Sequence, residues 1–181
     1  MQEEQSLVKR AQENDQDAFA ELYERYFDRI FRYIALKIGD RHEAEDLTQQ
    51  VFLKALRSIS SFKWQDVPFS AWLYRIAHNQ VVDHLRQKTR RPTTQLEEAM
   101  EQFSDESDNP QKSAELRMDI DSLMQALKRL TPSQREVIAL RFSSELPIAD
   151  VARVMGKSEG AIKAMQHSAV LALRRIMVTV E

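Results

Sequence analysis

One stretch has the pattern of two helices joined by a tight turn: Pro147-Ile-Ala-Asp-Val-Ala-Arg-Val-Met-Gly-Lys-Ser-Glu-Gly-Ala-Ile-Lys-Ala-Met165. Ala152 supplies the small side chain that a crossing helix needs, and Gly156 allows the positive φ of a tight turn. Ser158 is placed to cap the second helix, whose Ile162 would be buried against the first. The stretch therefore predicts a helix-turn-helix.

In DNA-binding helix-turn-helix domains, the exposed N-terminal side of the second helix enters the major groove. That side carries here six residues: Ser158, Glu159, Gly160, Lys163, Ala164 and His167. The basic pair Arg174-Arg175 favours DNA binding, whereas Glu159 and Ala164 offer bases little. A plain helical hairpin in the core of a bundle has the same spacing. These residues alone therefore fit this second interpretation as well.

The rest of the chain is also expected to be helical. Apolar residues recur every three or four positions from Asp17 to Ile38, and Gly39 suits the cap after this helix. Asp40, with Glu43 three residues on, is expected to form the N-cap box of a second helix whose inward residues are Ala44, Leu47, Val51, Ala55 and Leu56. Pro68 suits the first position of a third helix, which is expected over Phe69 to about Arg90 with Leu73, Ile76, Ala77 and Leu85 inward. With 3 Gly in 181 residues, the predicted fold class is all-α.

Composition narrows the possible classes of protein. A length of 181 residues predicts one or two domains, and 43 % hydrophobic residues suffice for a core. The absence of Cys excludes disulfides and thiolate metal sites, and favours a reducing cytoplasm. No apolar run is long enough to span a membrane, and no secretory signal is expected. We therefore expect a cytoplasmic protein without membrane insertion.

Charge is segregated along the chain although the net charge is only −2. Residues 92–121 carry a net charge of −7, between two segments, 72–91 and 122–181, that each carry +4. A protein that contacts phosphates at two separate places needs such segregation, although ordinary surface variation also produces it in short segments.

Residues 92–115 are expected to form an acidic flexible linker. They hold few large apolar groups and the helix-stopping pair Asn109-Pro110. The Thr131-Pro-Ser-Gln134 stretch beyond it has the offsets of a capping box. The predicted domains are therefore two helical domains, residues 1–91 and 116–181, joined by this linker.

The helix after Pro68 carries a second face at three-and-four spacing: Trp72, Arg75, Asn79, Val82 and Arg86. Aromatic and cationic groups in one stripe suit single-stranded nucleic acid, because bases stack on rings while cations hold the backbone. Phe62 and Trp64 precede this stripe, and Lys88, Arg90 and Arg91 follow it. Trp72 alone would more often be a core residue, so the hypothesis rests on the combination.

Three motifs near the N-terminus resemble conserved region two of bacterial sigma factors: Asp46-Leu-Thr-Gln-Gln-Val-Phe-Leu-Lys-Ala-Leu56, Pro68-Phe-Ser-Ala-Trp-Leu-Tyr-Arg-Ile-Ala-His-Asn79 and Val82-Asp-His-Leu-Arg86. Leu130-Thr-Pro-Ser-Gln-Arg-Glu-Val-Ile138 with the helix-turn-helix resembles their region four. No region three lies between them. In this respect the chain resembles the extracytoplasmic function (ECF) subfamily of the sigma-70 family. The resemblance covers about residues 18–91 and 120–176.

The resemblance implies a transcription initiation factor that binds RNA polymerase core and directs it to promoters. Asp46, Gln49 and Gln50 would contact the β′ clamp helices, and the C-terminal domain the β flap. The loop 60–66 would hold a flipped base of the minus-ten element. The residues implied for minus-ten binding and strand opening are Phe62, Lys63, Trp64, Trp72, Tyr74, Arg75, Asn79, Asp83, Arg86, Lys88, Arg90 and Arg91. Those for the minus-thirty-five element are Ser158, Glu159, Gly160, Lys163, Gln166, His167 and Arg174.

The chain departs from the family's usual pattern in two places. Family members often carry Glu at the position of Gln50, so the clamp contact is expected to be weaker or differently charged. Many also carry Ser-Arg at Ala164-Met165 and an Arg-rich run at 168–170. Contacts with bases at those positions do not carry over, which leaves Lys163, Gln166 and His167 as the better candidates.

The resemblance also implies that partners are needed. Because net charge is near zero, the free chain is expected to bind promoter DNA poorly until polymerase positions both domains. The acidic linker would thread a basic channel of polymerase and mimic nucleic acid. ECF proteins are commonly held inactive by an anti-sigma factor, which is therefore an expected partner.

Three other classes of protein stay open from the residues. An enzyme is disfavoured, because the histidines His42, His78, His84 and His167 have no zinc-ligand spacing and no phosphate loop or nucleophile motif is present. No cofactor, metal or small-molecule substrate is therefore expected. An ordinary helix-turn-helix regulator would bind a palindrome as a dimer without polymerase. A pure interaction module would dock protein alone.

Overall fold

The computed structural model describes residues 2–64, 67–90, 122–123 and 125–178. The N-terminal domain contains α1 (Gln2–Gln12), α2 (Gln16–Ile38), α3 (Arg41–Ser58), the 3₁₀ turn η1 (Ile59–Ser61) and α4 (Phe69–Arg90). The C-terminal domain contains α6 (Pro132–Ile138), the π-helical turn η2 (Ala139–Ser143), α7 (Ile148–Met155) and α8 (Glu159–Val178). Residues 122–123 and 125–128 are also helical. Every regular element in these ranges is helical, so the predicted all-α class with two helical domains is confirmed.

Most of the predicted helix ends are confirmed. Gly39 ends α2 with a φ of 78°, and Gly156 ends α7 with a φ of 63°. The Asp40 carboxylate accepts from the backbone N–H of Glu43 at 2.8 Å and so caps α3. The Glu43 side chain does not close the expected box, because its carboxylate binds His84 and Lys88 instead. Thr131 and Gln134 form the complete capping box before α6. These ends depend on contacts within four residues, which is why the sequence predicts them.

Four expectations need correction. Helix α1 was not predicted, although Leu7, Val8 and Ala11 lie on one buried face. Helix α4 has the predicted bounds, Phe69–Arg90, but Pro68 takes the cap position before its first residue, since the Pro68 carbonyl accepts from the N–H of Trp72. Leu56 is 50 % exposed, because one residue along a helix turns it about 100° from the inward Ala55. Leu85 is 37 % exposed, whereas its neighbours His84 and Lys88 are the residues that reach Glu43 of α3.

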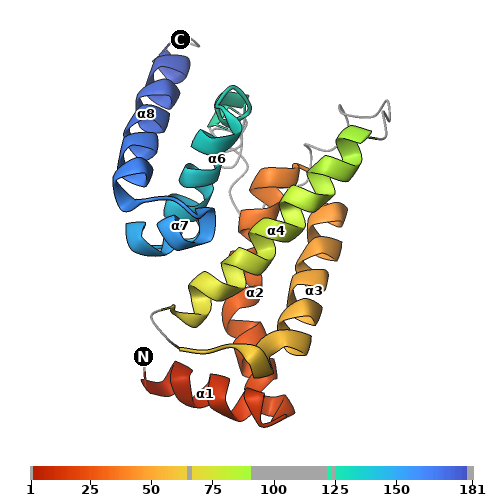
Figure 1. Cartoon of the computed structure of the whole chain (residues 1–181). Helices are drawn as coiled ribbons and strands as arrows, with labels where there is room; N and C mark the ends of the chain where they lie inside the picture. Colours follow the sequence, from red (N-terminus) through yellow and green to blue (C-terminus); the bar gives the residue numbers. More distant parts are fainter. Residues whose placement is uncertain (1, 65–66, 91–121, 124, 179–181) are drawn as a thin grey trace, which may run out of the picture.

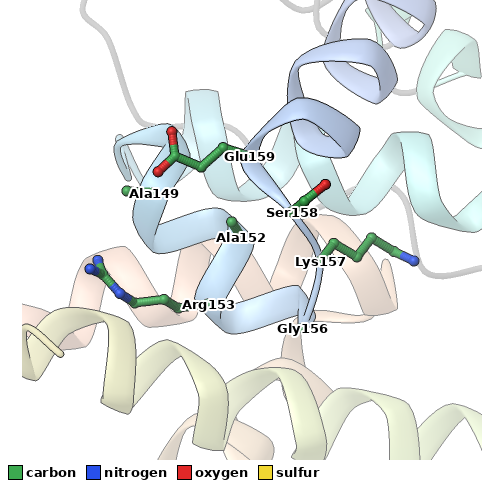
Figure 2. A pocket seen from close by; sticks show the side chains of 7 residues that line it. All are labelled: Ala149, Ala152, Arg153, Gly156, Lys157, Ser158 and Glu159. Carbon is green, nitrogen blue, oxygen red and sulfur yellow. The ribbon is translucent and has the colours of Figure 1, made fainter. Parts of the chain in front are cut away.

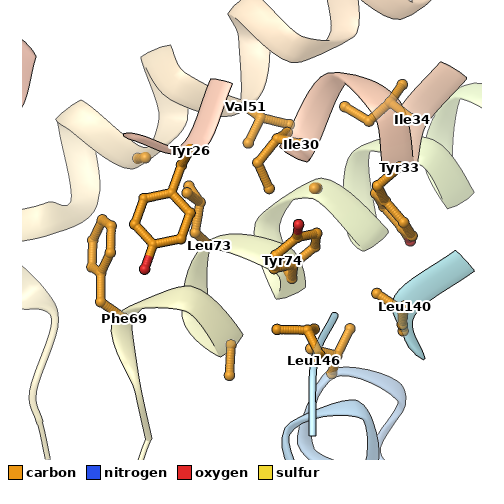
Figure 3. Packing of buried hydrophobic residues seen from close by; sticks show 14 of the residues in the cluster. Tyr26, Ile30, Tyr33, Ile34, Val51, Phe69, Leu73, Tyr74, Leu140 and Leu146 are labelled. Carbon is orange, nitrogen blue, oxygen red and sulfur yellow. The ribbon is translucent and has the colours of Figure 1, made fainter. Parts of the chain in front are cut away.

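The N-terminal domain is a bundle of α2, α3 and α4, with α1 lying across one end (Figure 1). The C-terminal domain packs on this bundle through η2 and α7, which contact α2 and α4. Leu140 and Leu146 therefore join the same buried cluster as Tyr33 and Tyr74 (Figure 3). The predicted linker, residues 92–115, lies outside the described residues, as does the expected start of the second domain at residue 116.

Candidate functional site

The residues implied for polymerase binding share one exposed face of α3. Asp46, Gln49 and Gln50 are all exposed, and Leu53 continues this face with half of its surface accessible. The side chain of Gln50 accepts a hydrogen bond from Gln80 Nε2 at 3.2 Å. Gln80 in turn accepts from Lys54 Nζ at 2.6 Å. The structure therefore brings this group together, with Gln50 held against α4.

The loop after α3 carries a cluster of aromatic rings. The Phe62 ring is buried, with its centroid 5.3 Å from that of Trp64 and 5.1 Å from that of Trp72. Phe69 completes the cluster, 5.4 Å from Trp72. Both Trp side chains are half-buried and Lys63 is exposed. Phe62 is thus the base of the cluster, whereas the two indoles and Lys63 form its accessible part.

The predicted stripe on α4 is largely exposed. Arg75, Asn79, Asp83 and Arg86 all reach solvent. Lys88 instead donates to both carboxylate oxygens of Glu43 at 3.0 Å. Tyr74 differs from the others on the predicted list: it is fully buried and lies beside Leu146 of the C-terminal domain (Figure 3). Arg91 lies outside the described residues, as does the side chain of Arg90.

The helix-turn-helix has the geometry that its sequence predicts. Ile162 is fully buried, and Ser158 Oγ accepts from the N–H of Ala161 at 3.2 Å to cap α8. The predicted DNA-facing side is exposed, comprising Ser158, Glu159, Gly160, Lys163, Ala164 and His167, and Arg174 further along is exposed too. Gln166 is half-buried, because its side-chain oxygen accepts from Arg141 Nε at 3.0 Å.

A shallow hollow of about 440 Å³ lies between α7 and the first turn of α8 (Figure 2). Its lining includes Arg153, Lys157, Ser158 and Glu159. Arg153 donates to the buried carboxylate of Asp150 at 2.6 Å, so part of its charge is already compensated. The hollow therefore lies on the same surface as the side of α8 that is predicted to contact DNA.

A buried polar cluster that no local sequence pattern indicates lies between the two domains. Glu136 of α6 accepts from Tyr33 Oη at 2.5 Å and forms an ion pair with Lys37, both from α2. His78 Nδ1 of α4 lies 2.9 Å from Oε1 of Glu136 and must donate, because an ionised carboxylate only accepts. Beside this cluster, Arg29 donates to the carbonyl of Ser144 at 2.6 Å. We call Glu136 with Tyr33, Lys37 and His78 the interdomain cluster.

The interdomain cluster holds its carboxylate in the charged form. Burial alone raises the pKa of Glu136, but the hydrogen bond from His78, the charge and hydrogen bond of Lys37 and the hydroxyl of Tyr33 together lower it to about 2. Burial, with the negative charge of Glu136, raises the pKa of Tyr33 well above its usual value. Tyr33 therefore stays a donor at any physiological pH.

The described residues contain no group of three or more His, Asp and Glu side chains arranged to hold a metal ion. In the same part of the chain, no helix is long and apolar enough to cross a bilayer.

Comparisons with known proteins agree with this geometry. Sigma-70 region 2 matches residues 22–91, and Sigma-70, region 4 matches residues 126–175. The ECF RNA polymerase sigma factor BldN of Streptomyces coelicolor is 42 % identical over 94 % of this chain, which spans 64 % of BldN. SigW of Bacillus subtilis, also named an ECF RNA polymerase sigma factor, is 30 % identical over 93 % of both chains.

Solved structures share the fold. CnrH, in complex with the cytosolic domain of CnrY, has a TM-score of 0.75 at 21 % identity over 99 % of both chains. RpoE of Bartonella quintana, in complex with the anti-sigma factor NepR, has a TM-score of 0.70 at 22 % identity over 88 % of this chain and 96 % of its own. From the matched regions and relatives, this chain belongs to the ECF subfamily of the sigma-70 family.

Proposed function

We propose that this protein is a dissociable specificity subunit of RNA polymerase, which binds the core enzyme and directs it to promoters of one class. The observation that carries the proposal is that one chain contains both sigma-70 region 2 and region 4, separated by residues that match neither. Two reading domains on one chain suit a DNA site with two separate elements. The protein would act in the cytoplasm, and the chemistry of transcription would belong entirely to polymerase.

Polymerase binding is assigned to the exposed face of α3. Asp46, Gln49 and Gln50 would meet the clamp helices, and the exposed Leu53 and Leu56 would add apolar area to that contact. The C-terminal domain would contact the β flap. The exposure of all five α3 residues on one face supports this assignment.

Minus-ten binding is assigned to the aromatic cluster and the α4 stripe. Stacking one flipped base on an aromatic ring contributes about 1–3 kcal/mol. Opening one step of duplex costs about 1.4 kcal/mol on average. One or two captured bases thus offset only about one to four steps of melting, so strand opening needs the polymerase. This balance supports a factor that is inactive on DNA by itself.

Minus-thirty-five binding is assigned to the exposed side of α8, where Lys163 and His167 are the candidates for base contacts. Gln166 would need to exchange its hydrogen bond with Arg141 for one with DNA. Tyr74 would take part at the minus-ten element only after the C-terminal domain moves off α4, since that domain covers it. Two further points stay predictions. One is the set of domain limits, 1–91, 92–115 and 116–181, and the other is a role for the acidic linker in a polymerase channel.

An anti-sigma factor is proposed as a further partner. CnrH and RpoE, which share the fold of this chain, are each described in complex with a second protein, and NepR is named an anti-sigma factor. A protein that holds this chain away from polymerase would lower transcription from its promoters without altering the promoter sequence that is recognised.

Run-off transcription with purified core polymerase on a genomic promoter library tests the proposed function. We expect a discrete set of start sites that share two elements, and one copy of this chain per polymerase. Lys163→Ala should change preference at the upstream element, whereas Lys9→Ala, the same change on exposed α1, should not. Specific binding to duplex DNA at nanomolar strength without polymerase would instead favour an ordinary helix-turn-helix regulator.

A further inference from the structure

We propose that Gln12 is a positioning residue for the minus-ten loop, here defined as residues 59–64. This inference rests on the proposed function, because it assumes that this loop receives DNA. Gln12 is the last residue of α1, and its side-chain amide reaches the loop across the end of the bundle. Nε2 donates to the carbonyl of Ile59 at 2.9 Å and to that of Phe62 at 2.7 Å.

The two carbonyls mark the two ends of one turn. The carbonyl of Ile59 also accepts from the N–H of Phe62 at 3.0 Å, which closes the turn from within. The amide of Gln12 spans the turn from outside and uses both of its hydrogens, one for each carbonyl. Both hydrogen bonds are partly buried, so removing the donor would leave carbonyls without a replacement of equal quality.

Helix α1 is anchored well enough to act as a support for this amide. Leu7, Val8 and Ala11 are buried in the core of the N-terminal domain. Tyr26 of α2 donates a hydrogen bond to Glu4, which ties the middle of the domain to the first turn of α1. The backbone of Gln12 is therefore fixed in place. Its two hydrogen bonds hold the loop against α1 and limit the movement of the loop.

The restricted turn leads directly into the accessible part of the aromatic cluster. Phe62, whose carbonyl Gln12 holds, is packed against Trp72 and Trp64. Lys63 and Trp64 follow immediately, so a displacement of the turn displaces both. Sigma-70 region 2 matches from residue 22 onward, which leaves α1 and Gln12 outside the matched region. A loop that is held before DNA arrives avoids the ordering cost of binding.

The test uses the full chain assembled with core polymerase on a promoter that the wild-type protein recognises. Gln12→Glu has nearly the same shape but replaces two donors with oxygens that face two carbonyls. Gln5→Glu, an exposed residue of the same helix, repeats the change in charge and serves as the matched control. Ile30→Val in the core of α2 lowers stability elsewhere and controls for a general loss of folding.

The measured quantity is the rate of open-complex formation on templates that carry each of the four bases at every minus-ten position. We expect Gln12→Glu to reduce the preference for the best base by about fivefold, the factor that corresponds to one lost hydrogen bond. Core binding and preference at the upstream element should stay as in the wild type. Gln12→Ala should reduce the same preference by a smaller factor, and Gln5→Glu should not change it.

Two outcomes would overturn the inference. One is an unchanged minus-ten preference in both Gln12 variants. The other is a loss of preference that Ile30→Val reproduces at equal stability, because Gln12 would then only support folding. A wild-type protein that assembles with polymerase without selecting any promoter would instead overturn the proposed function, and this result is distinct because it needs no variant.

Discussion

Two clusters in this protein combine the same three residue types, Glu, His and Lys, at very different depths. In the interdomain cluster, the Glu136 side chain is 5 % exposed and Lys37 is 9 % exposed. On the surface of the N-terminal domain, Glu43 binds His84 at 3.1 Å and Lys88 at 3.0 Å, with 35 % of the Glu43 side chain exposed. Apart from Tyr33, which only the interdomain cluster contains, the pairings are alike, so burial is the main difference between them.

Because the interdomain cluster is buried, its stability depends on every charge having a partner. A buried charge is tolerated only with a partner, and removing one partner leaves the other uncompensated at a cost of about 3–5 kcal/mol. An exposed pair is already well solvated and is worth about 0.2–1 kcal/mol. Because Glu136 lies in one domain and its partners in the other, that larger energy acts on the contact between the domains.

The largest effect is expected for Glu136→Ala. This variant leaves Lys37 charged in a buried site and removes the acceptor of Tyr33, so docking of the two domains should weaken by about 3–5 kcal/mol. The chain lacks Cys, so labels on cysteines introduced at the exposed Glu24 and Lys157 report the distance between the domains. An unchanged distance distribution at neutral pH would contradict this expectation.

A double replacement should recover most of the loss. Lys37→Met and Glu136→Leu should each weaken docking by a few kcal/mol, whereas the combined variant leaves no buried charge and should come close to the wild type. The same labels measure all four proteins. Additive losses in the double variant would mean that the two side chains do not act as a pair.

Acid should separate the domains through the interdomain cluster. The pKa of Glu136 is about 2 in the docked state against an ordinary value of 4.5. Its contribution to docking is therefore fully present above about pH 4.5 and is lost as the pH falls towards 2, because protonation removes the charge that Lys37 and His78 bind. Labelled wild type and Glu136→Gln should differ most above this range and converge below it, since the variant carries no titrating group there.

The smallest effect is expected for Glu43→Ala. The substitution removes one carboxylate on the surface of the domain, 35 % exposed, from His84 and Lys88, so the free energy of unfolding should fall by about 1 kcal/mol or less. Raising the salt concentration should reduce the effect further, because exposed charges are screened. Urea unfolding at low and high salt measures it, and a loss as large as that of Glu136→Ala would remove the distinction drawn between the clusters.

Sequence reasoning succeeded where the causes lie close together along the chain. The cap of Asp40 on Glu43 and the box of Thr131 with Gln134 each span three residues, and both are confirmed. The exposed side of α8 also follows from helical spacing alone. Which of those exposed residues contact polymerase or DNA depends on the bound partner, which this chain alone does not contain. The binding site therefore stays a prediction.

The missed features depend on how distant segments meet. Glu136 lies 99 residues from Lys37 and 58 from His78, and no local pattern indicates that the three converge. Tyr74 was placed with the stripe of α4 by its resemblance to the family, yet it faces the other domain. Where a helix such as α4 carries large apolar side chains on more than one side, the elements packed against it decide which of these sides is covered.

The contact between the domains also has a consequence for a protein cut in two. Every group in the interdomain cluster is held by its own half of the molecule, α2 and α4 on one side and α6 on the other. The covalent connection therefore acts mainly by raising the effective concentration of one half around the other. Proteolysis between them would turn an intramolecular equilibrium into a bimolecular one, in which dilution alone pulls the halves apart.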